Sequence, residues 1–459
     1  MQQLSDAQKS GSFRWEFSRL LMLAWPVILT NLNWSLMGLI DVAVVSQLGT
    51  DELAALAAAR MPAWVALAIA IAGLSGVLVF AARADGAGQY EQSGDILRQG
   101  LILAAICGCI SMGIFLLFPV QILSALFIAA PIQLPSAAVM SAYAWGFPGQ
   151  LIMVTAAYFL EGISQPKKVM MVNLGILPIN GIITYYWAMG GGPFDAMGAV
   201  GAGYATSLSS TIGALWMVYL ASFNADRILR GTYLFQWALW KGAGRNLAAL
   251  AKFGITPGIA SGLELGGFIF LVALSTQMGN EAAAAFQLML SVHNVGFALS
   301  IGIASALGVR VGNAMGAAQG HDVPRRIFMA AIMAILILGV MSIIAIIFAG
   351  HISMWFESDA AVGALAASMM IVMLSFLIFD GLQMLFTYAL RSLGRQEIAA
   401  FNGIIAFFVI MGGSAYYFTH AGWGAIGLAW AAGIGMLSAT ILHLWALIRS
   451  RHLMTAQIC

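Results

Sequence analysis

Long apolar stretches separated by short polar segments most constrain the fold of this chain. A bilayer-spanning helix needs about 20 apolar residues, and only 8% of the chain is charged, against about 25% in soluble domains. There is too little charge to coat a water-facing surface of 459 residues. We predict an all-α polytopic membrane protein with twelve transmembrane helices. The predicted spans lie near residues 20–46, 53–82, 99–121, 138–160, 168–189, 198–222, 252–277, 283–309, 327–350, 362–389, 397–419 and 424–448.

The basic residues indicate how these spans are oriented. If the chain crosses the bilayer twelve times, every Lys and Arg except Arg60 lies among the segments of one side. Cytoplasmic segments carry an excess of Lys and Arg, so we expect both termini and the link between spans six and seven to be cytoplasmic. The first twenty residues are polar and lack the apolar core and cleavage site of a signal peptide. We therefore expect the first span to be retained.

The chain contains an internal repeat at an offset of about 230 residues. LGTDELAALA at residue 48 matches MGNEAAAAFQ at residue 278, and RADGAGQ at residue 83 matches NAMGAAQ at residue 313. We predict two six-helix bundles, formed by residues 1–235 and 236–459. Because six is even, both bundles insert the same way up and are related by a pseudo-twofold axis along the membrane normal. Parallel repeats around a central site are typical of transporters.

Two acids lie deep inside apolar spans. Glu264 is about twelve residues beyond Lys252, and Asp380 is about eleven residues before Arg391. At a rise of 1.5 Å per residue, both carboxylates lie roughly 17 Å from the cytoplasmic helix ends. Two carboxylates held close in low dielectric need a proton, a metal cation or a cationic ligand. We predict a shared cation-coupling site; the alternative is a protonated acid hydrogen-bonded across helices.

The repeat serves as an internal control for these acids. Gln150 is the counterpart of Asp380, and Asn33 or Trp34 is the counterpart of Glu264. The six-span unit therefore does not need an acid at either of these positions in order to fold.

Asp41 is a third acid in an apolar span, about five residues from its external end. Water is nearer there, so a structural role competes with cation coupling. Asn180 and Gln287 lie in apolar stretches of their own. We expect both to line a central cleft with Asn33 and Gln150, although membrane helices also use Asn and Gln to hydrogen-bond one another.

Three further polar residues have open roles. His293 either carries protons or is a packed neutral group, and Glu161 either acts in the membrane or caps a cytoplasmic helix end beside Lys167 and Lys168. Arg60 is expected to be anchored at the outer interface.

An enzyme is the weaker hypothesis. GLSG at residues 73–76 has the form used by intramembrane serine proteases, but the chain has 51 glycines, and the repeat places Ser305 opposite Ser75 without the preceding glycine. The chain has no Gly-x-x-x-x-Gly-Lys motif for ATP and no His-Glu-x-x-His motif for zinc. We expect no enzyme activity and no cofactor, with an ion gradient as the source of energy.

Several segments resemble the multidrug and toxic compound extrusion (MATE) family in its NorM-like bacterial branch. The similar segments are LAWPVILTNLNWSLMGLIDVAVVSQLG at residue 23, FLEGISQPKKVMMV at 159, IGIASALGVRVGNAMGAAQG at 301 and LRSLGRQEIAAFNG at 390. The resemblance implies a V-shaped pair of six-helix bundles.

The resemblance also implies roles for particular residues. It places the family's first-helix aspartate on Asp41, its seventh-helix glutamate on Glu264 and its tenth-helix aspartate on Asp380. It also places two binding residues on Asn180 and Gln287. It implies that Glu264 and Asp380 hold Na⁺ where sodium is the coupling ion. The family tyrosine one turn before Asp380 is Phe376 here, which puts sodium coordination in question.

The resemblance also implies a function, and we predict on that basis a multidrug efflux antiporter that exports amphipathic, mostly cationic compounds in exchange for Na⁺ or H⁺. The alternative transport function is a flippase for lipid-linked precursors, which would need a basic cavity where this chain has acids. The net charge of +2 gives no sign of nucleic-acid binding. We expect a monomer in the bacterial inner membrane, in contact with lipids.

Overall fold

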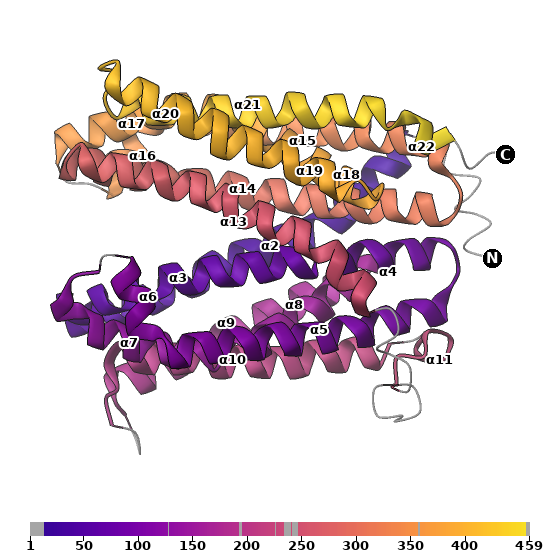
Figure 1. Cartoon of the computed structure of the whole chain (residues 1–459), viewed down its shortest axis with the longest axis horizontal. Coiled ribbons are helices and arrows are strands. Elements are labelled where there is room, and N and C mark those ends of the chain that lie inside the picture. Colours follow the sequence, from indigo (N-terminus) through magenta and orange to yellow (C-terminus); the bar gives the residue numbers. More distant parts are fainter. Residues whose placement is uncertain are drawn as a thin grey trace. The chain divides into compact units, whose positions relative to one another are not determined.

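The computed structural model describes residues 13–126, 128–191, 195–224, 226–233, 240, 247–356 and 359–455, and these residues are almost entirely helical (Figure 1). The helices before the predicted midpoint are α2 Phe13–Val45, α3 Thr50–Leu74, α4 Gly76–Gly86, α5 Tyr90–Leu117, α6 Pro119–Ala125, α7 Ala130–Ala144, α8 Phe147–Gly162, α9 Pro166–Met189, α10 Gly198–Ser222 and α11 Arg227–Arg230. Those after it are α13 Leu247–Gln277, α14 Asn280–Gly316, α15 Val323–Ile347, α16 Ala349–Phe356, α17 Ala360–Ser375, α18 Leu377–Ser392, α19 Gln396–Gly403, α20 Gly412–His420, α21 Ile426–Arg449 and α22 Arg451–Thr455, with a π-helical segment at Ile404–Met411 between α19 and α20.

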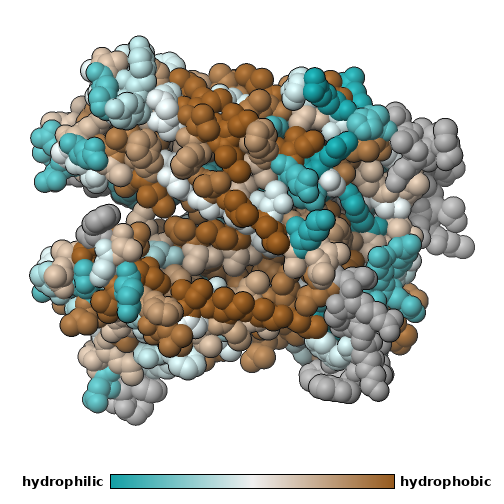
Figure 2. All heavy atoms as spheres, in the orientation of Figure 1, coloured by the Kyte–Doolittle hydropathy of each residue, from teal (hydrophilic) through white to brown (hydrophobic). Residues whose placement is uncertain are grey.

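Nine helices in the described part of the chain are long and apolar enough to cross a membrane, or up to eleven if each of two bent helix pairs forms one span. α10 coincides with the sixth predicted span but is not among them. Its sequence is rich in Gly, Ser and Thr, the residue types that let membrane helices approach closely. On the face in Figure 2, hydrophobic side chains cover the middle of the helices and hydrophilic ones gather near their ends. The prediction of an all-helical polytopic membrane protein is confirmed.

The two bent pairs break at matching positions of the repeat. α7 and α8 meet at 44° around Trp145 and Gly146, and α17 and α18 meet at 44° around Phe376. A break starts a new helix inside the span, and the N-terminal turn of a helix favours negative charge. Asp380 lies in the first turn of α18, so the break places its carboxylate where the helix dipole stabilises it.

Contacts divide the chain into two compact units. We call Leu29–Gly258 the N-unit, and Met1–Ile28 together with Ile259–Cys459 the C-unit. These units are not simple sequence halves, because the first part of α2 groups with the C-unit and the first part of α13 groups with the N-unit. The boundary predicted between residues 235 and 236 lies outside the described residues and stays a prediction.

Small residues determine how closely the helices pack in both units. In the N-unit, Gly203 of α10 lies against α7, where a Cβ would meet the Val139 carbonyl oxygen at 3.1 Å. In the C-unit, Gly302 of α14 lies against α2, where a Cβ would lie 2.9 Å from the Ile28 backbone nitrogen. Without water to drive helix association, such close backbone contact supplies dispersion energy. These contacts hold the helices that carry the polar residues described below.

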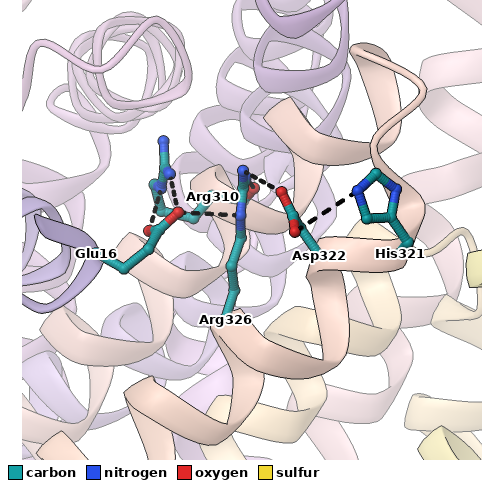
Figure 3. Close-up of polar contacts among 5 residues, drawn as sticks. All are labelled: Glu16, Arg310, His321, Asp322 and Arg326. Carbon is teal, nitrogen blue, oxygen red and sulfur yellow. Dashed lines mark hydrogen bonds and ion pairs between the residues drawn. The ribbon is translucent and has the colours of Figure 1, made fainter. Parts of the chain in front are cut away.

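A buried ion-pair cluster joins the start of α2 to α14 and α15 within the C-unit (Figure 3). Glu16 is 2% exposed and accepts hydrogen bonds from Arg310, one of them 3.2 Å from Nε. Arg326 Nε lies 3.4 Å from the same carboxylate, and Arg326 Nη2 lies 3.8 Å from Asp322. A carboxylate this deeply buried needs such partners, so the cluster fixes the beginning of α2 against the C-unit.

Candidate functional site

Asp380 lies at the centre of a polar cluster in the C-unit. The residue is 3% exposed. Asp380 Oδ2 lies 3.2 Å from Nε2 of His293 on α14, and Oδ1 accepts a hydrogen bond of 3.3 Å from Gln383, one turn later on α18. Both oxygens are therefore contacted by nitrogen groups without a permanent charge.

His293 is held in place by aromatic rings. Phe268 of α13 stacks on the imidazole at a centroid distance of 6.4 Å, and Phe297 of α14 lies at 6.2 Å. The histidine is 4% exposed. This packing fixes the ring plane and directs Nε2 toward Asp380.

Glu264 lies on α13 in the same unit and is partly exposed. It interacts electrostatically with Asp380 and with Arg391. In the described part of the chain, neither Glu264 nor Asp380 forms an ion pair with Lys or Arg. The predicted proximity of the two acids and their shared role in cation coupling stay predictions.

Sodium prefers hard oxygen ligands, and the surroundings of Asp380 offer few. Phe376 has no hydroxyl group, and its ring packs on Trp430 at 5.7 Å. No group of three or more His, Cys, Asp or Glu able to hold a metal ion occurs among the described residues. In the observed geometry, the Asp380 carboxyl group contacts the His293 imidazole and accepts from the Gln383 side-chain amide.

Asp41 is the centre of a second polar cluster, in the N-unit. It is 3% exposed, and its two oxygens accept hydrogen bonds of 3.1 Å each, one from Thr184 of α9 and one from Thr206 of α10. Asn180 donates to the Thr206 hydroxyl at 3.4 Å, and no described residue hydrogen-bonds its buried Oδ1. The cluster is rich in oxygen and combines three helices.

The other predicted cleft residues occupy different environments. Asn33 is 1% exposed and donates to the Asn173 backbone oxygen at 2.9 Å, an arrangement that joins α2 to α9. Gln150 is partly exposed in the first turn of α8, and Gln287 is exposed on α14. Glu161 is buried in the last turn of α8. None of these four residues contacts Asp41 or Asp380 in the described hydrogen bonds.

Sequence reasoning missed Thr184 and Thr206 as partners of Asp41, and it did not pair His293 with Asp380. Threonine is common in membrane helices, where its hydroxyl usually bonds within its own helix, so the sequence carried no signal for these two. His293 stood out as a polar residue in an apolar span, but only the packing of α14 on α18 supplies its partner.

Comparison with known proteins connects this geometry to a family. The MatE family profile matches two segments, residues 26–187 and 258–415, one in each half of the chain. The chain belongs to the MatE family. The resemblance seen in the sequence is confirmed, and the two matched segments agree with the internal repeat.

Proteins with similar sequences are named as multidrug resistance proteins. A probable multidrug resistance protein NorM of Xanthomonas campestris pv. campestris is 28% identical over 92% of this chain and 91% of its own length. Multidrug resistance protein PmpM of Pseudomonas aeruginosa is 25% identical over 95% of this chain and 92% of its own length. The matches to these MatE relatives extend over nearly the whole chain.

Solved MATE structures share the fold. The eukaryotic MATE transporter AtDTX14 superposes with a TM-score of 0.87 at 20% identity, covering 97% of this chain and 98% of its own. An outward-facing multidrug resistance MATE family transporter superposes with a TM-score of 0.85 at 21% identity, covering 96% of both chains. These superpositions confirm the MATE transporter fold that the resemblance implies, whereas the division into two six-helix bundles stays a prediction.

The family assignment excludes the enzyme hypothesis. MatE proteins are transporters, and Ser75 of the GLSG stretch donates its hydroxyl proton to the Ala72 carbonyl oxygen at 2.6 Å. A serine whose hydroxyl bonds within its own helix is a packing residue. The chain is a multi-pass membrane transporter.

Proposed function

We propose that this chain is a secondary active multidrug efflux antiporter that exports amphipathic, mostly cationic compounds in exchange for Na⁺ or H⁺. The NorM and PmpM relatives are described as multidrug resistance proteins, which supports drug export. The acids in the spans support cation exchange, because a buried carboxylate attracts either a coupling ion or a cationic substrate. The coupling ion and the exported compound then compete for the acids of the spans, or their binding is coupled through these acids.

The observation that best supports this proposal is the burial of Asp380 beside partners that carry no permanent charge. Its carboxyl group is almost fully buried in a helix that begins inside the membrane, and its partners His293 and Gln383 carry no permanent charge. A buried charge without a resident counter-charge costs several kcal/mol. Binding of an exchangeable cation relieves that cost, so cation binding and conformation are coupled.

In the proposed cycle, Na⁺ or H⁺ reaches Asp380 and Glu264 from outside and favours release of the exported compound. Loss of the cation to the cytoplasm then restores the site for the next compound. One charge moving through 100 mV supplies about 2.3 kcal/mol, or about fifty-fold in concentration ratio. This driving force is sufficient for efflux without ATP.

We further propose that the protein acts as a monomer in the bacterial inner membrane with both termini in the cytoplasm. The strong bias of Lys and Arg toward one side of the spans supports this orientation.

The test is efflux of ethidium from proteoliposomes under a sodium gradient and, separately, a proton gradient. We expect one gradient to drive efflux by the unmodified protein and Asp380→Asn to abolish that response. The matched control is Asp359→Asn, at the N-cap of α17, where the carboxylate accepts from the Ala361 and Val362 amides. Asparagine caps helices about as well as aspartate, so this variant keeps its transport.

If Asp380→Asn responds to the gradient as the unmodified protein does, the acid is structural and the coupling proposal is wrong. If neither gradient moves ethidium in any variant, drug export is wrong, and transport of an anionic lipid-linked precursor becomes the next function to assay.

A further inference from the structure

Arg60 is the one basic residue that the charge distribution of the spans did not explain. It lies on α3 and is partly exposed. Its Nη1 donates a hydrogen bond of 3.0 Å to the backbone oxygen of Gly38 on α2. The guanidinium is therefore fixed on a neighbouring helix and does not simply extend toward a lipid headgroup.

Gly38 is suited to this contact because it has no side chain. A Cβ at this position would overlap Nη2 of Arg60. Helix carbonyl groups point toward the C-terminal end, where each normally bonds the amide four residues later. A group bound to the Gly38 oxygen therefore lies at the level of the next helical turn, which contains Asp41.

Asp41 interacts electrostatically with Arg60, whose described hydrogen bond goes to the Gly38 backbone oxygen and not to the Asp41 carboxylate. The other groups acting on the carboxyl are the hydroxyl-bearing side chains of Thr184, Thr206 and Tyr143. Among the described residues, Arg60 is thus the only permanently charged group that acts on this acid. The hydrogen-bond partners of Asp380, by contrast, are His293 and Gln383, neither of which carries a permanent charge.

We propose that Arg60 is a specificity-determining residue of the transport reaction, held on Gly38 as the resident positive counter-charge of Asp41. The proposal rests on the proposed function, in which acids in the spans bind the coupling cation. With its counter-charge built in, Asp41 does not need an exchangeable cation. The exchanged cation then belongs to Asp380 and Glu264 of the C-unit, and the N-unit acid binds cationic compounds only weakly.

The proposal predicts that neutralising Arg60 creates additional cation binding. Unit charges several ångströms apart at a partly buried site change binding of a cation about tenfold. We expect Arg60→Gln to lower the external cation concentration that half-saturates ethidium efflux by about tenfold. The double variant Arg60→Gln with Asp41→Asn returns that concentration to the original value, because no uncompensated acid remains.

Two further variants separate charge from helix packing. Arg60→Lys keeps the charge, so the half-saturating concentration stays unchanged. Gly38→Ala displaces the guanidinium without removing it and shifts the concentration in the same direction as Arg60→Gln, by a smaller factor. Direct binding of ethidium to purified protein, measured by fluorescence titration, gives a second readout and is expected to tighten about tenfold in Arg60→Gln.

If Arg60→Gln folds, as judged by gel filtration and thermal unfolding, and leaves both values unchanged, Arg60 is an interface anchor and the inference is wrong. If Arg60→Gln does not fold, the half-saturating cation concentration and the ethidium affinity of Gly38→Ala test the inference instead. Failure of the proposed function is distinguishable, because it appears as an unchanged gradient response in Asp380→Asn, with Arg60 intact.

Discussion

His293 and Asp380 form a buried pair between α14 and α18, with 3.2 Å between Nε2 and Oδ2. Both residues are at most 4% exposed. A hydrogen bond in such a dry setting is costly to remove, because the remaining group keeps its desolvation penalty. The pair should therefore affect both the stability of the C-unit and the cation binding that we propose for Asp380.

This pair predicts the effect of replacing His293. Leucine leaves Asp380 Oδ2 without its neighbour, and an unsatisfied buried group costs about 1–3 kcal/mol. We expect His293→Leu to lower the Tm of the detergent-purified protein and to weaken gradient-driven ethidium efflux. His293→Gln retains an N–H donor and is expected to recover most of both values. Equal behaviour of the two variants would mean that only ring packing matters at this position.

Thr184 allows the second cluster to be tested with little change in shape. It is fully buried and donates to Asp41 Oδ1 at 3.1 Å. Thr184→Val removes only the hydroxyl, so we expect a loss of about 1–3 kcal/mol in stability and weaker ethidium efflux. Thr184→Ser keeps the donor and serves as the control. A Thr184→Val protein with unchanged thermal unfolding would contradict this role.

The cluster in Figure 3 predicts unequal costs for two acids. Glu16 is 2% exposed and lies between Arg310 and Arg326, whereas the side chain of Asp322 is 29% exposed. Breaking a buried ion pair costs about 3–5 kcal/mol, while an exposed pair contributes about 0–1 kcal/mol. Thermal unfolding should therefore show a large loss for Glu16→Gln and a small one for Asp322→Asn. A reversed order would show that the start of α2 is not fixed by Glu16.

Two glycines of α13 provide a matched packing test. Gly254 faces Gly73 of α3 so closely that a Cβ would overlap the Gly73 carbonyl oxygen, whereas nothing lies within 4 Å of a Cβ on Gly266. Gly254→Ala must displace a backbone, and overpacking typically costs about 1–3 kcal/mol. Gly266→Ala should be neutral or slightly stabilising, because alanine favours helix by about 1 kcal/mol. Thermal unfolding of both variants measures this difference. Similar losses of stability in the two variants would contradict the close contact between Gly254 and Gly73.

The composition and the spacing of apolar residues determined the class of fold. A chain with so few charges must satisfy its backbone internally within lipid, and helices achieve this locally. The repeat offset followed from the sequence alone because duplication leaves matching residues at constant spacing, and the family profile matches both halves. The isolation of Asp41, Glu264 and Asp380 in apolar surroundings also marked these residues without coordinates.

Tertiary structure alone decided which groups meet these acids. The partners His293, Thr184 and Thr206 come from other helices, and sequence separation says nothing about which faces of two helices meet. Packing also decides that the first part of α2 groups with the C-unit, through Glu16, and that the first part of α13 groups with the N-unit, through Gly254. The sequence shows that a charged residue lies in an apolar span and is therefore costly to bury. Which side chains offset that cost depends on how the helices pack against one another.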